Sequence, residues 1–233
     1  MFTKTAEFYD ALYAFKDYGQ ACNNLHQLIQ EHQPKAKALL DIACGSGKHL
    51  TYLRNYYDVQ GLDINEELLS VARRRCPDVK FHHEDMTDFN LGQSFDAVVC
   101  LFSSIGYVCT VENLNKAIQC MVDHLSPGGV LVLEPWITKE KYWQDHLAAN
   151  YVDQPNLKIA WMYKHEMEDS RSIFNINYLV GTAESVESFT EQHVMGLWTE
   201  QEYREAFKKA GIAVHYDEKG LFGRGMYYGK KSN

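Results

Sequence analysis

The stretch that most constrains this chain is LLDIACGSGKHL, residues 39–50. Ala38 to Ile42 are apolar apart from one aspartate and predict a buried parallel strand. In the small-residue turn that follows, Gly45 and Gly47 lack the Cβ atoms that would hinder a sharp bend or a close approach to a bound molecule. Residues 48–57 can then open a helix. The sequence therefore predicts a strand, a ligand-binding loop and a helix in succession.

Two ligand-binding patterns and a purely structural tight turn compete for this loop. The dinucleotide fingerprint needs G-x-G-x-x-G, but Leu50 stands at the third glycine position, which disfavours an NAD oxidoreductase. Instead, an acid is followed by three residues, Gly, one residue and Gly, from Asp41 to Gly47. This pattern resembles motif I of the class I methyltransferases that depend on S-adenosylmethionine (SAM). A tight turn without a ligand stays open as the alternative.

Acidic residues follow the next two predicted strands. Asp63 stands just past a strand over 57–62, one strand–helix unit after the glycine loop. A carboxylate there can accept both hydroxyl hydrogens of a ribose, and a solvated loop acid is the alternative. The third strand, 79–83, leads to Asp85 and Met86. By resemblance to SAM enzymes, these two positions bind the adenine amino group and a ring nitrogen.

The expected fold is α/β, a doubly wound Rossmann-like parallel sheet, because five βα-like units carry hydrophobic strands. Within 1–136, the tyrosine-rich segment 1–33 looks helical and predicts either core packing or a lid over a ligand. Residues 137–197 are expected to form a small inserted antiparallel sheet, and 198–233 a helix and strands that complete the core. The strands expected in the insertion are 158–167, 172–182 and 186–197.

Composition narrows the classes of partner. The net charge of −8 argues against nucleic acid or a membrane surface as a partner, because phosphate backbones select basic faces. No apolar run approaches the roughly 20 residues that span a bilayer, and the N-terminus lacks a signal-peptide core. The six cysteines form no CxxC pair and are expected to be reduced thiols of a cytoplasmic protein. His82 and His83 point to opposite faces of a strand, so no metal site is expected.

Three further residues are candidate substrate contacts. Ligands of open α/β sheets bind outside the carboxyl ends of the strands, and Glu134 and Trp136 close a core strand there. A structural role is the alternative for both. Arg224 lies between two glycines, where its guanidinium can grip a phosphate bidentately. A surface salt bridge is the alternative.

Beyond the class, the chain is similar to the N,N-dimethyltransferases of nucleotide-linked 3-amino-deoxysugars, of the desosamine and mycaminose type. The matching segments are YDALYAFKDY, HHEDMTDFNLGQSFDAVVCLFSSIGYV, SPGGVLVLEPW, LWTEQEYREAFKKAGIAV and GRGMYYG. This resemblance covers most of the chain and implies SAM as the sole cofactor and a sugar nucleotide as the small-molecule substrate. The residues that it implies around the cofactor are Tyr9, Tyr18, Ala43, Gly45, Gly47, His49, Asp63, Ile64, Asp85, Met86 and Leu101.

The resemblance also implies roles around the methyl acceptor. Tyr107 matches a position beside the acceptor amine and is the candidate catalytic residue, with a rim aromatic as the alternative; Arg224 matches an arginine near the nucleotide's phosphates. Residues 137–157 match little, so another amine, a hydroxyl or a carboxylate acceptor stays open, as does a non-catalytic SAM-binding protein. His165 and His193 are interpreted as surface or core histidines rather than bases. The oligomeric state is open as well, a homodimer included.

Overall fold

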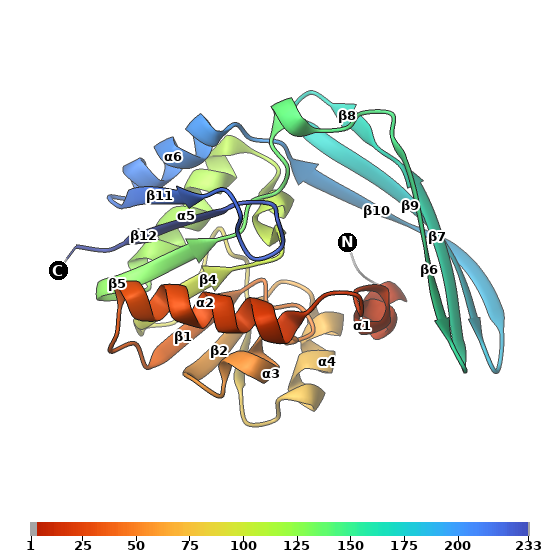
Figure 1. Cartoon of the computed structure of the whole chain (residues 1–233), viewed down its shortest axis with the longest axis horizontal. Helices are drawn as coiled ribbons and strands as arrows, with labels where there is room; N and C mark the ends of the chain where they lie inside the picture. The colour runs from red at the N-terminus through yellow and green to blue at the C-terminus, as the bar shows by residue number, and fades with distance from the viewer. Residues whose placement is uncertain (1–3, 233) are drawn as a thin grey trace.

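The structure, a computed structural model, describes residues 4–232 and contains two sheets (Figure 1). The strands of the central sheet are β1 Ala38–Ile42, β2 Asp58–Asp63, β3 Lys80–His83, β4 Phe95–Cys100, β5 Leu125–Leu133, β11 Ala213–Asp217 and β12 Met226–Lys230. They lie in the order β11-β12-β5-β4-β1-β2-β3. β1 to β5 pair in parallel, whereas β12 is antiparallel to both β5 and β11. The predicted doubly wound sheet is thereby confirmed, and two C-terminal strands extend it.

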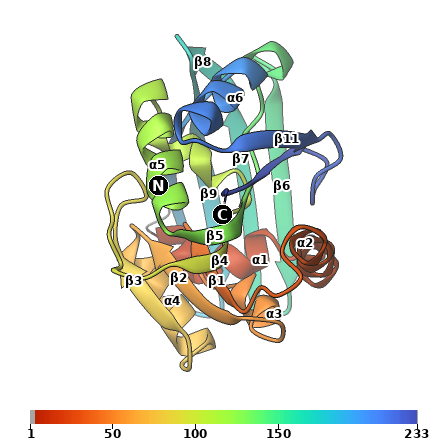
Figure 2. The ribbon, with the colours of Figure 1, turned by 90° about the vertical axis from the view of Figure 1, so that its left-hand side faces the viewer.

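Helices cover both faces of the central sheet (Figure 2). The elements are η1 Lys4–Phe8, α1 Tyr9–Leu12, α2 Tyr18–His32, α3 Leu50–Leu53, α4 Glu66–Arg75, η2 Ser104–Val108, α5 Val111–Asp123, η3 Lys139–Lys141 and α6 Glu200–Lys209. Successive residues of β1 point to opposite faces. Leu40 packs in the cluster that includes α5 and α6, and Leu39 in the cluster that includes α2 and α3. None of the helices in the described part of the chain combines the length and the apolar character needed to cross a bilayer.

Local sequence signals explain where the longer helices begin. The side chain of Thr110 accepts a hydrogen bond from Asn113 N at the start of α5, and Thr199 and Glu202 form a capping box at the start of α6. The helix expected over 48–57 is reduced to α3, because the chain turns there to enter β2. The N-terminal helical region is likewise divided, since Asp17 caps a new helix, α2.

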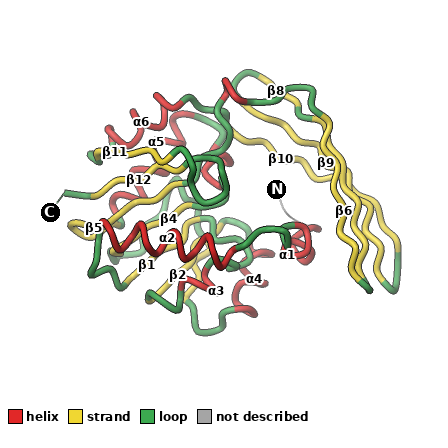
Figure 3. Tube along the Cα trace, viewed as in Figure 1, coloured by secondary structure: helices red, strands yellow, loops and turns green. Residues whose placement is uncertain are grey.

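The second sheet is antiparallel and stands beside the core, with α1 between the two (Figure 3). Its strands are β6 Leu147–Gln154, β7 Leu157–Lys164, β8 Glu166–Glu168, β9 Arg171–Thr182 and β10 Val186–Gly196. The three expected strands are present, in the sequential order β10-β9-β7-β6. β6 was not predicted, because six of its eight residues are exposed and its sequence gives no clear inside–outside alternation. The strand expected over 158–167 is broken into β7 and β8.

Candidate active site

The glycine loop begins where β1 ends and follows a backbone path that few residues adopt. Ala43, Gly45 and Gly47 have positive φ angles of 55°, 55° and 73°. A Cβ at Gly47 would lie 3.2 Å from the Cβ of Ala72, so this glycine lets α4 pack against the loop. Among the described residues, a Cβ at Gly45 would come within 4 Å of Leu68 alone, at 3.9 Å. Gly45 is therefore needed for its backbone conformation, in a part of the loop that lines a cavity.

Asp63, the last residue of β2, ties the glycine loop to the neighbouring strand. Its Oδ2 accepts a hydrogen bond from Gly45 N at 2.7 Å, and its Oδ1 accepts one from Asn65 N at 2.8 Å. Burial raises the pKa of this carboxyl, and the N–H donors oppose that rise. A carboxylate offers about four acceptor sites. Asp63 thus has acceptor capacity left for a ligand.

A cavity opens in front of the glycine loop, and we call it the loop cavity. Seven of the residues predicted to bind the cofactor line it: Tyr9, Ala43, Gly45, Asp63, Ile64, Asp85 and Met86. The other four predicted residues, Tyr18, Gly47, His49 and Leu101, are not part of this lining. The remaining lining residues are Leu62, Leu68, Glu84, Thr87, Ser104, Tyr107, Val108 and Asn113. The structure therefore brings together the three predicted strand-end contacts, Asp63, Asp85 and Met86.

Two buried polar atoms close to the glycine loop find no hydrogen-bond partner within residues 4–232. They are Oδ2 of Asp41, in β1, and Nε2 of His49, two residues past the loop. Burial raises the pKa of Asp41 well above its ordinary value and lowers the pKa of His49 to about 4. The ring of Tyr18 lies 5.0 Å from that of His49. Since an unpaired buried polar atom is unfavourable, this region fits a polar ligand that completes its hydrogen bonding.

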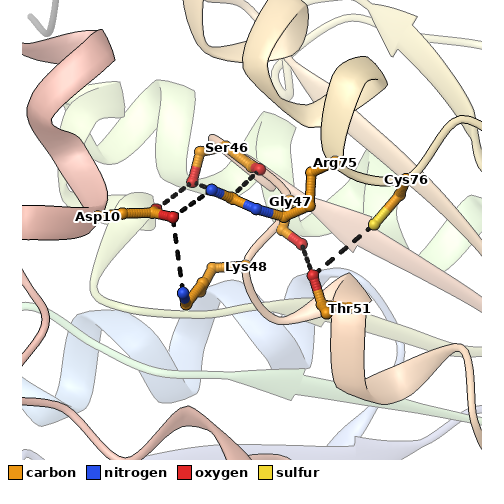
Figure 4. Close-up of polar contacts among 7 residues, drawn as sticks. All are labelled: Asp10, Ser46, Gly47, Lys48, Thr51, Arg75 and Cys76. Carbon is orange, nitrogen blue, oxygen red and sulfur yellow. Dashed lines mark hydrogen bonds and ion pairs between the residues drawn. The ribbon is translucent and has the colours of Figure 1, made fainter.

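An ionic cluster fastens the N-terminal segment to the glycine loop (Figure 4). Asp10 of α1 accepts a hydrogen bond from Ser46 Oγ at 3.1 Å and forms an ion pair with Arg75 at the end of α4. Arg75 also donates to Ser46 Oγ at 2.8 Å, and Lys48 Nζ lies 3.5 Å from Asp10. Residues of the loop and of α4 therefore hold α1, which carries Tyr9, against the loop cavity.

A second cavity, the inner cavity, lies where the second sheet faces the core. The second sheet contributes Asn150, Trp161, Tyr163, Phe174, Ile176, Tyr178, His193 and Met195. The rest of the chain contributes Tyr9, Leu12, Tyr13, Phe15, Lys16, Phe102, Ser104, Tyr107, Trp136, Phe222 and Arg224. Tyr9, Ser104 and Tyr107 line both cavities. The two cavities therefore adjoin at these three residues.

Tyr107 is joined to a buried polar chain of the second sheet. Its hydroxyl lies 2.8 Å from Nδ1 of His193, and Nε2 of His193 lies 3.9 Å from a carboxylate oxygen of Glu191. Thr5 donates to the same carboxylate through its backbone N–H at 3.1 Å. Burial raises the pKa of Tyr107 well above its ordinary value and lowers the pKa of His193 to about 4. At neutral pH, both groups are therefore uncharged.

Two cations line the inner cavity among aromatic rings. Lys16 Nζ lies 3.9 Å from the ring centroids of both Phe102 and Phe222. The guanidinium carbon of Arg224 lies 4.9 Å from the ring of Trp136. Burial, together with the charge of Arg224, lowers the pKa of Lys16 to about 8. Because both cations line the same cavity, they favour an anionic ligand there.

The loop after β4 is strained and is supported from behind. Phe102 and Ser103 have positive φ angles of 55° and 63°. Oε2 of the fully buried Glu134 accepts a hydrogen bond from Phe102 N at 2.6 Å. Ser103 Oγ donates to the carbonyl of Pro135 at 2.8 Å and accepts from Arg224 at 3.0 Å. Glu134 is placed here as a support of the loop and is not among the residues that line the cavities described.

A third cavity, the outer cavity, continues from the inner one. The two share Trp136, Tyr163 and Arg224. The other residues of the outer cavity are Ile137, Thr138, Lys141, Trp143, His146, Ala148, His165, Tyr216, Glu218 and Gly223. Of the predicted substrate contacts, Trp136 and Arg224 thus lie at the border between two cavities.

Lys16 was not predicted as a site residue, Tyr13 was covered only by the expectation that segment 1–33 is core or lid, and His193 was interpreted as structural. All three line the inner cavity. A signal for His193 was available, because residues 191 and 193 of an alternating strand share a face, which here joins Glu191 to His193. Nothing in the sequence indicates that this face meets Tyr107, 86 residues earlier.

Comparisons with known proteins agree with this geometry. A methyltransferase domain family matches residues 39–129. The dTDP-3-amino-3,4,6-trideoxy-alpha-D-glucopyranose N,N-dimethyltransferase of Streptomyces venezuelae is 36% identical over 96% of both chains. The dTDP-3-amino-3,6-dideoxy-alpha-D-glucopyranose N,N-dimethyltransferase of Streptomyces fradiae is 37% identical over 96% of this chain and 89% of that protein.

Solved structures are similar over the same length. The crystal structure of DesVI of Streptomyces venezuelae superposes with a TM-score of 0.94 at 35% identity, covering 100% of both chains. A SAM-bound amino pentose methyltransferase from Micromonospora echinaspora gives a TM-score of 0.89 at 31% identity, covering 100% of this chain and 98% of that one. The chain is therefore a SAM-dependent methyltransferase of class I and belongs to the family of the nucleotide-linked aminosugar N,N-dimethyltransferases.

Proposed function

We propose that this enzyme methylates the amine of a nucleotide-linked aminosugar. The observation that carries the proposal is the succession of three adjoining cavities. The loop and inner cavities meet at Tyr9, Ser104 and Tyr107, and the inner and outer cavities meet beside Arg224. Cofactor, aminosugar and nucleotide would occupy them in that order, with a phosphate-binding cation between sugar and nucleoside.

The loop cavity fits the cofactor. SAM supplies an electrophilic methyl group on a sulfonium, and its leaving group departs neutral. Asp63 would accept the hydrogen bonds of the ribose hydroxyls, Asp85 would bind the adenine amino group, and the backbone N–H of Met86 a ring nitrogen. Asp41 and His49, whose buried polar atoms have no partner in residues 4–232, fit the polar amino-acid end of SAM.

The inner cavity fits an amine that needs alignment rather than a strong base. A neutral amine already carries a lone pair, so the protein has to orient it and exclude water, which contributes roughly 7–11 kcal/mol to lowering the barrier in favourable cases. Tyr107 would orient the amine, since it lines both cavities. Trp161 and Phe174 supply apolar walls that keep the approach dry.

Positive charge and aromatic rings fit the nucleotide end. Arg224 and Lys16 would bind the phosphates, because a guanidinium can contact phosphate oxygens in pairs and the ammonium adds a second charge. Trp143 and His165 line the outer cavity, where a base can stack on their rings. The support for Trp136 as a substrate contact is its place at the border between sugar and nucleotide.

The test is methylation of matched acceptors. The enzyme is incubated with SAM and either dTDP-3-amino-3,6-dideoxyglucose or the same aminosugar without its nucleotide, and the acceptor mass is followed. We expect one and then two methyl groups on the nucleotide-linked acceptor. We expect kcat/KM to be at least about 100-fold lower for the free sugar, because it loses the charged contacts. Equal rates for both, or methylation of only a hydroxyl or carboxylate acceptor, would contradict the proposal.

We also propose a division of labour along the chain. Residues 1–136 and 198–233 would form the cofactor-binding core, and the inserted unit 137–197 would enclose the acceptor. The support for this division is that all five strands of the second sheet lie within 147–196 and that four of them line the inner cavity.

The expectations of a cytoplasmic location and of no nucleic-acid partner stay predictions, supported by six free cysteines and a net charge of −8.

A homodimer is proposed on the outer face of the second sheet. Tyr151 and Leu179 flank Ala160 in register and therefore share this face, and they are 76% and 50% exposed. Val186, 72% exposed, lies on the same face. An apolar surface of this kind is typical of a protein interface. Light scattering on the wild type and on Tyr151→Glu tests it: we expect a dimer that the glutamate shifts to monomer, and a monomeric wild type would refute it.

A further inference from the structure

The hydrogen bond between Tyr107 and His193 joins the two halves of the site. Tyr107 belongs to η2 of the core and His193 to β10 of the second sheet, and their polar atoms are 2.8 Å apart. Both residues line the inner cavity, and Tyr107 lines the loop cavity as well. His193 is only 3% exposed. The hydroxyl that borders both ligands is thus attached to a buried imidazole.

The charge near His193 indicates whether Tyr107 or His193 is the donor of their hydrogen bond. Nε2 of His193 lies 3.9 Å from the carboxylate of Glu191, which is too far for a hydrogen bond, but the negative charge at this distance favours the tautomer with its proton on Nε2. Nδ1 then carries a lone pair and can only accept. Burial lowers the pKa of His193 to about 4, so a second proton is absent at neutral pH. In this tautomer, the hydroxyl of Tyr107 donates to Nδ1, and the lone pairs of its oxygen remain for other donors.

We propose that His193 is a positioning residue that, by accepting the Tyr107 hydroxyl proton, fixes the Tyr107 oxygen as the acceptor for an N–H of the substrate amine. This inference rests on the proposed function. A hydroxyl free to rotate would also donate to the amine lone pair, which is the electron pair that must form the new N–C bond. When His193 holds the Tyr107 hydroxyl, the Tyr107 oxygen accepts an N–H of the amine. The lone pair of the amine then stays free and points toward the methyl group.

The same geometry limits the number of methyl groups transferred. As the N–C bond forms and the S–C bond breaks, the nitrogen becomes an ammonium, which releases a proton to solvent before it can react again. In its reactive neutral form, the primary amine has two N–H groups, the monomethyl amine has one and the dimethyl amine has none. Only the primary and the monomethyl amine can donate a hydrogen bond to the Tyr107 oxygen while presenting a lone pair to the methyl group. The arrangement therefore supports two rounds and disfavours a third.

A double-mutant cycle tests the positioning role with dTDP-3-amino-3,6-dideoxyglucose as acceptor. His193→Phe keeps a flat aromatic ring and removes the hydrogen-bond acceptor, and we expect kcat to fall about tenfold to a hundredfold. The KM of the acceptor and the Kd of SAM should change little. His193→Asn, whose Oδ1 can replace Nδ1, should restore most of the activity. In a Tyr107→Phe background, His193→Phe should have no further effect; an equal loss in both backgrounds would overturn the proposal.

A measurement without acceptor separates this inference from the proposed function. In enzyme that contains ¹⁵N-labelled histidine, the imidazole ¹⁵N NMR signals of His193 are assigned by their loss in His193→Asn. We expect an unprotonated Nδ1 and a protonated Nε2 at neutral pH, and Tyr107→Phe should shift the Nδ1 signal. A protonated Nδ1 would overturn the inference even if the enzyme methylates the aminosugar. A wild type that methylates no aminosugar nucleotide would refute the proposed function, and the ¹⁵N signals would still decide how Tyr107 and His193 are bonded.

Discussion

The loop cavity and the inner cavity are built in different ways. Ten of the fifteen residues that line the loop cavity lie between positions 43 and 87, within three successive strand–loop units of the central sheet. The inner cavity draws on residues from Tyr9 to Arg224, and the two sheets must dock before it exists. One cavity is therefore a local product of the core, and the other depends on contacts between distant segments.

This difference predicts that the two binding functions can be separated by mutation. Residues of the loop cavity should control SAM binding alone, and residues at the far end of the inner cavity should control the acceptor alone. Residues that link the two should affect both, or affect stability.

Asp63→Ala should have the largest effect, and only on the loop cavity. The variant loses the carboxylate proposed to bind the ribose, together with its hydrogen bond to Gly45 N. Charged hydrogen bonds contribute about 1.5–3 kcal/mol each, so we expect the Kd of SAM, measured by calorimetry, to rise about 100-fold. Asp58→Ala, at the exposed start of β2, is the matched control. A Kd within about threefold of the wild type would contradict the assignment.

Glu134→Ala tests the loop that both cavities share. It leaves the partly buried N–H of the strained Phe102 without its acceptor, so we expect the free energy of unfolding to fall by about 2 kcal/mol, measured by chemical denaturation. Glu134→Gln keeps an acceptor oxygen and is the matched control. If alanine and glutamine destabilise the protein equally, the hydrogen bond to Phe102 is not what matters.

The wild type and Glu134→Gln should also differ in how their stability depends on pH. Burial raises the pKa of Glu134, so the folded state holds this proton more tightly than the unfolded chain does. The stability contributed by the group therefore rises as pH falls through its folded pKa. Glu134→Gln has no proton to bind there. We expect the stability of the wild type to increase relative to Glu134→Gln as pH is lowered from neutral, and the opposite trend would contradict the raised pKa.

Arg224→Ala should affect the acceptor and leave the cofactor untouched. The variant loses the guanidinium at the border of the inner and outer cavities, so we expect the KM for dTDP-3-amino-3,6-dideoxyglucose to rise about tenfold. The Kd of SAM should stay within about twofold of the wild type. Arg204→Ala is the control, because that arginine pairs with Glu200 on the exposed side of α6. Equal effects on SAM and acceptor would mean that the two cavities are not independent.

The sequence predicted the loop cavity well for a topological reason. Consecutive parallel strands end at the same edge of a sheet, so Asp63 and Asp85 could be placed beside the glycine loop from their order alone. Both line the cavity together with Gly45. Of the residues implied by the resemblance, Tyr9 and Ile64 line the cavity as well, whereas His49 and Leu101 do not.

The inner cavity was not predictable in this way. Trp161, Tyr178 and His193 belong to an antiparallel sheet whose docking on the core is not encoded in any local pattern. The edge strand β6 was missed because its mostly exposed residues give no period. Arg224 was predicted from its flanking glycines and from the family resemblance, not from any pattern that places it in this cavity. Pairings such as Tyr107 with His193 become visible only when the two sheets are seen together.

The smallest predicted effect concerns the segment that touches both regions. Asp10→Asn removes the charge that holds α1 to Arg75 and Lys48 beside the glycine loop. Partly exposed ion pairs contribute only about 0.2–1 kcal/mol, so we expect the Kd of SAM to rise about threefold at low salt and the difference to shrink at high salt. Asp78→Asn, which breaks a comparable ion pair with Arg54, should leave the Kd of SAM unchanged at low and at high salt. A salt-insensitive loss would mean that α1 is held by the packing of Leu12 on the second sheet rather than by charge, and the N-terminal segment would then belong with the inner cavity.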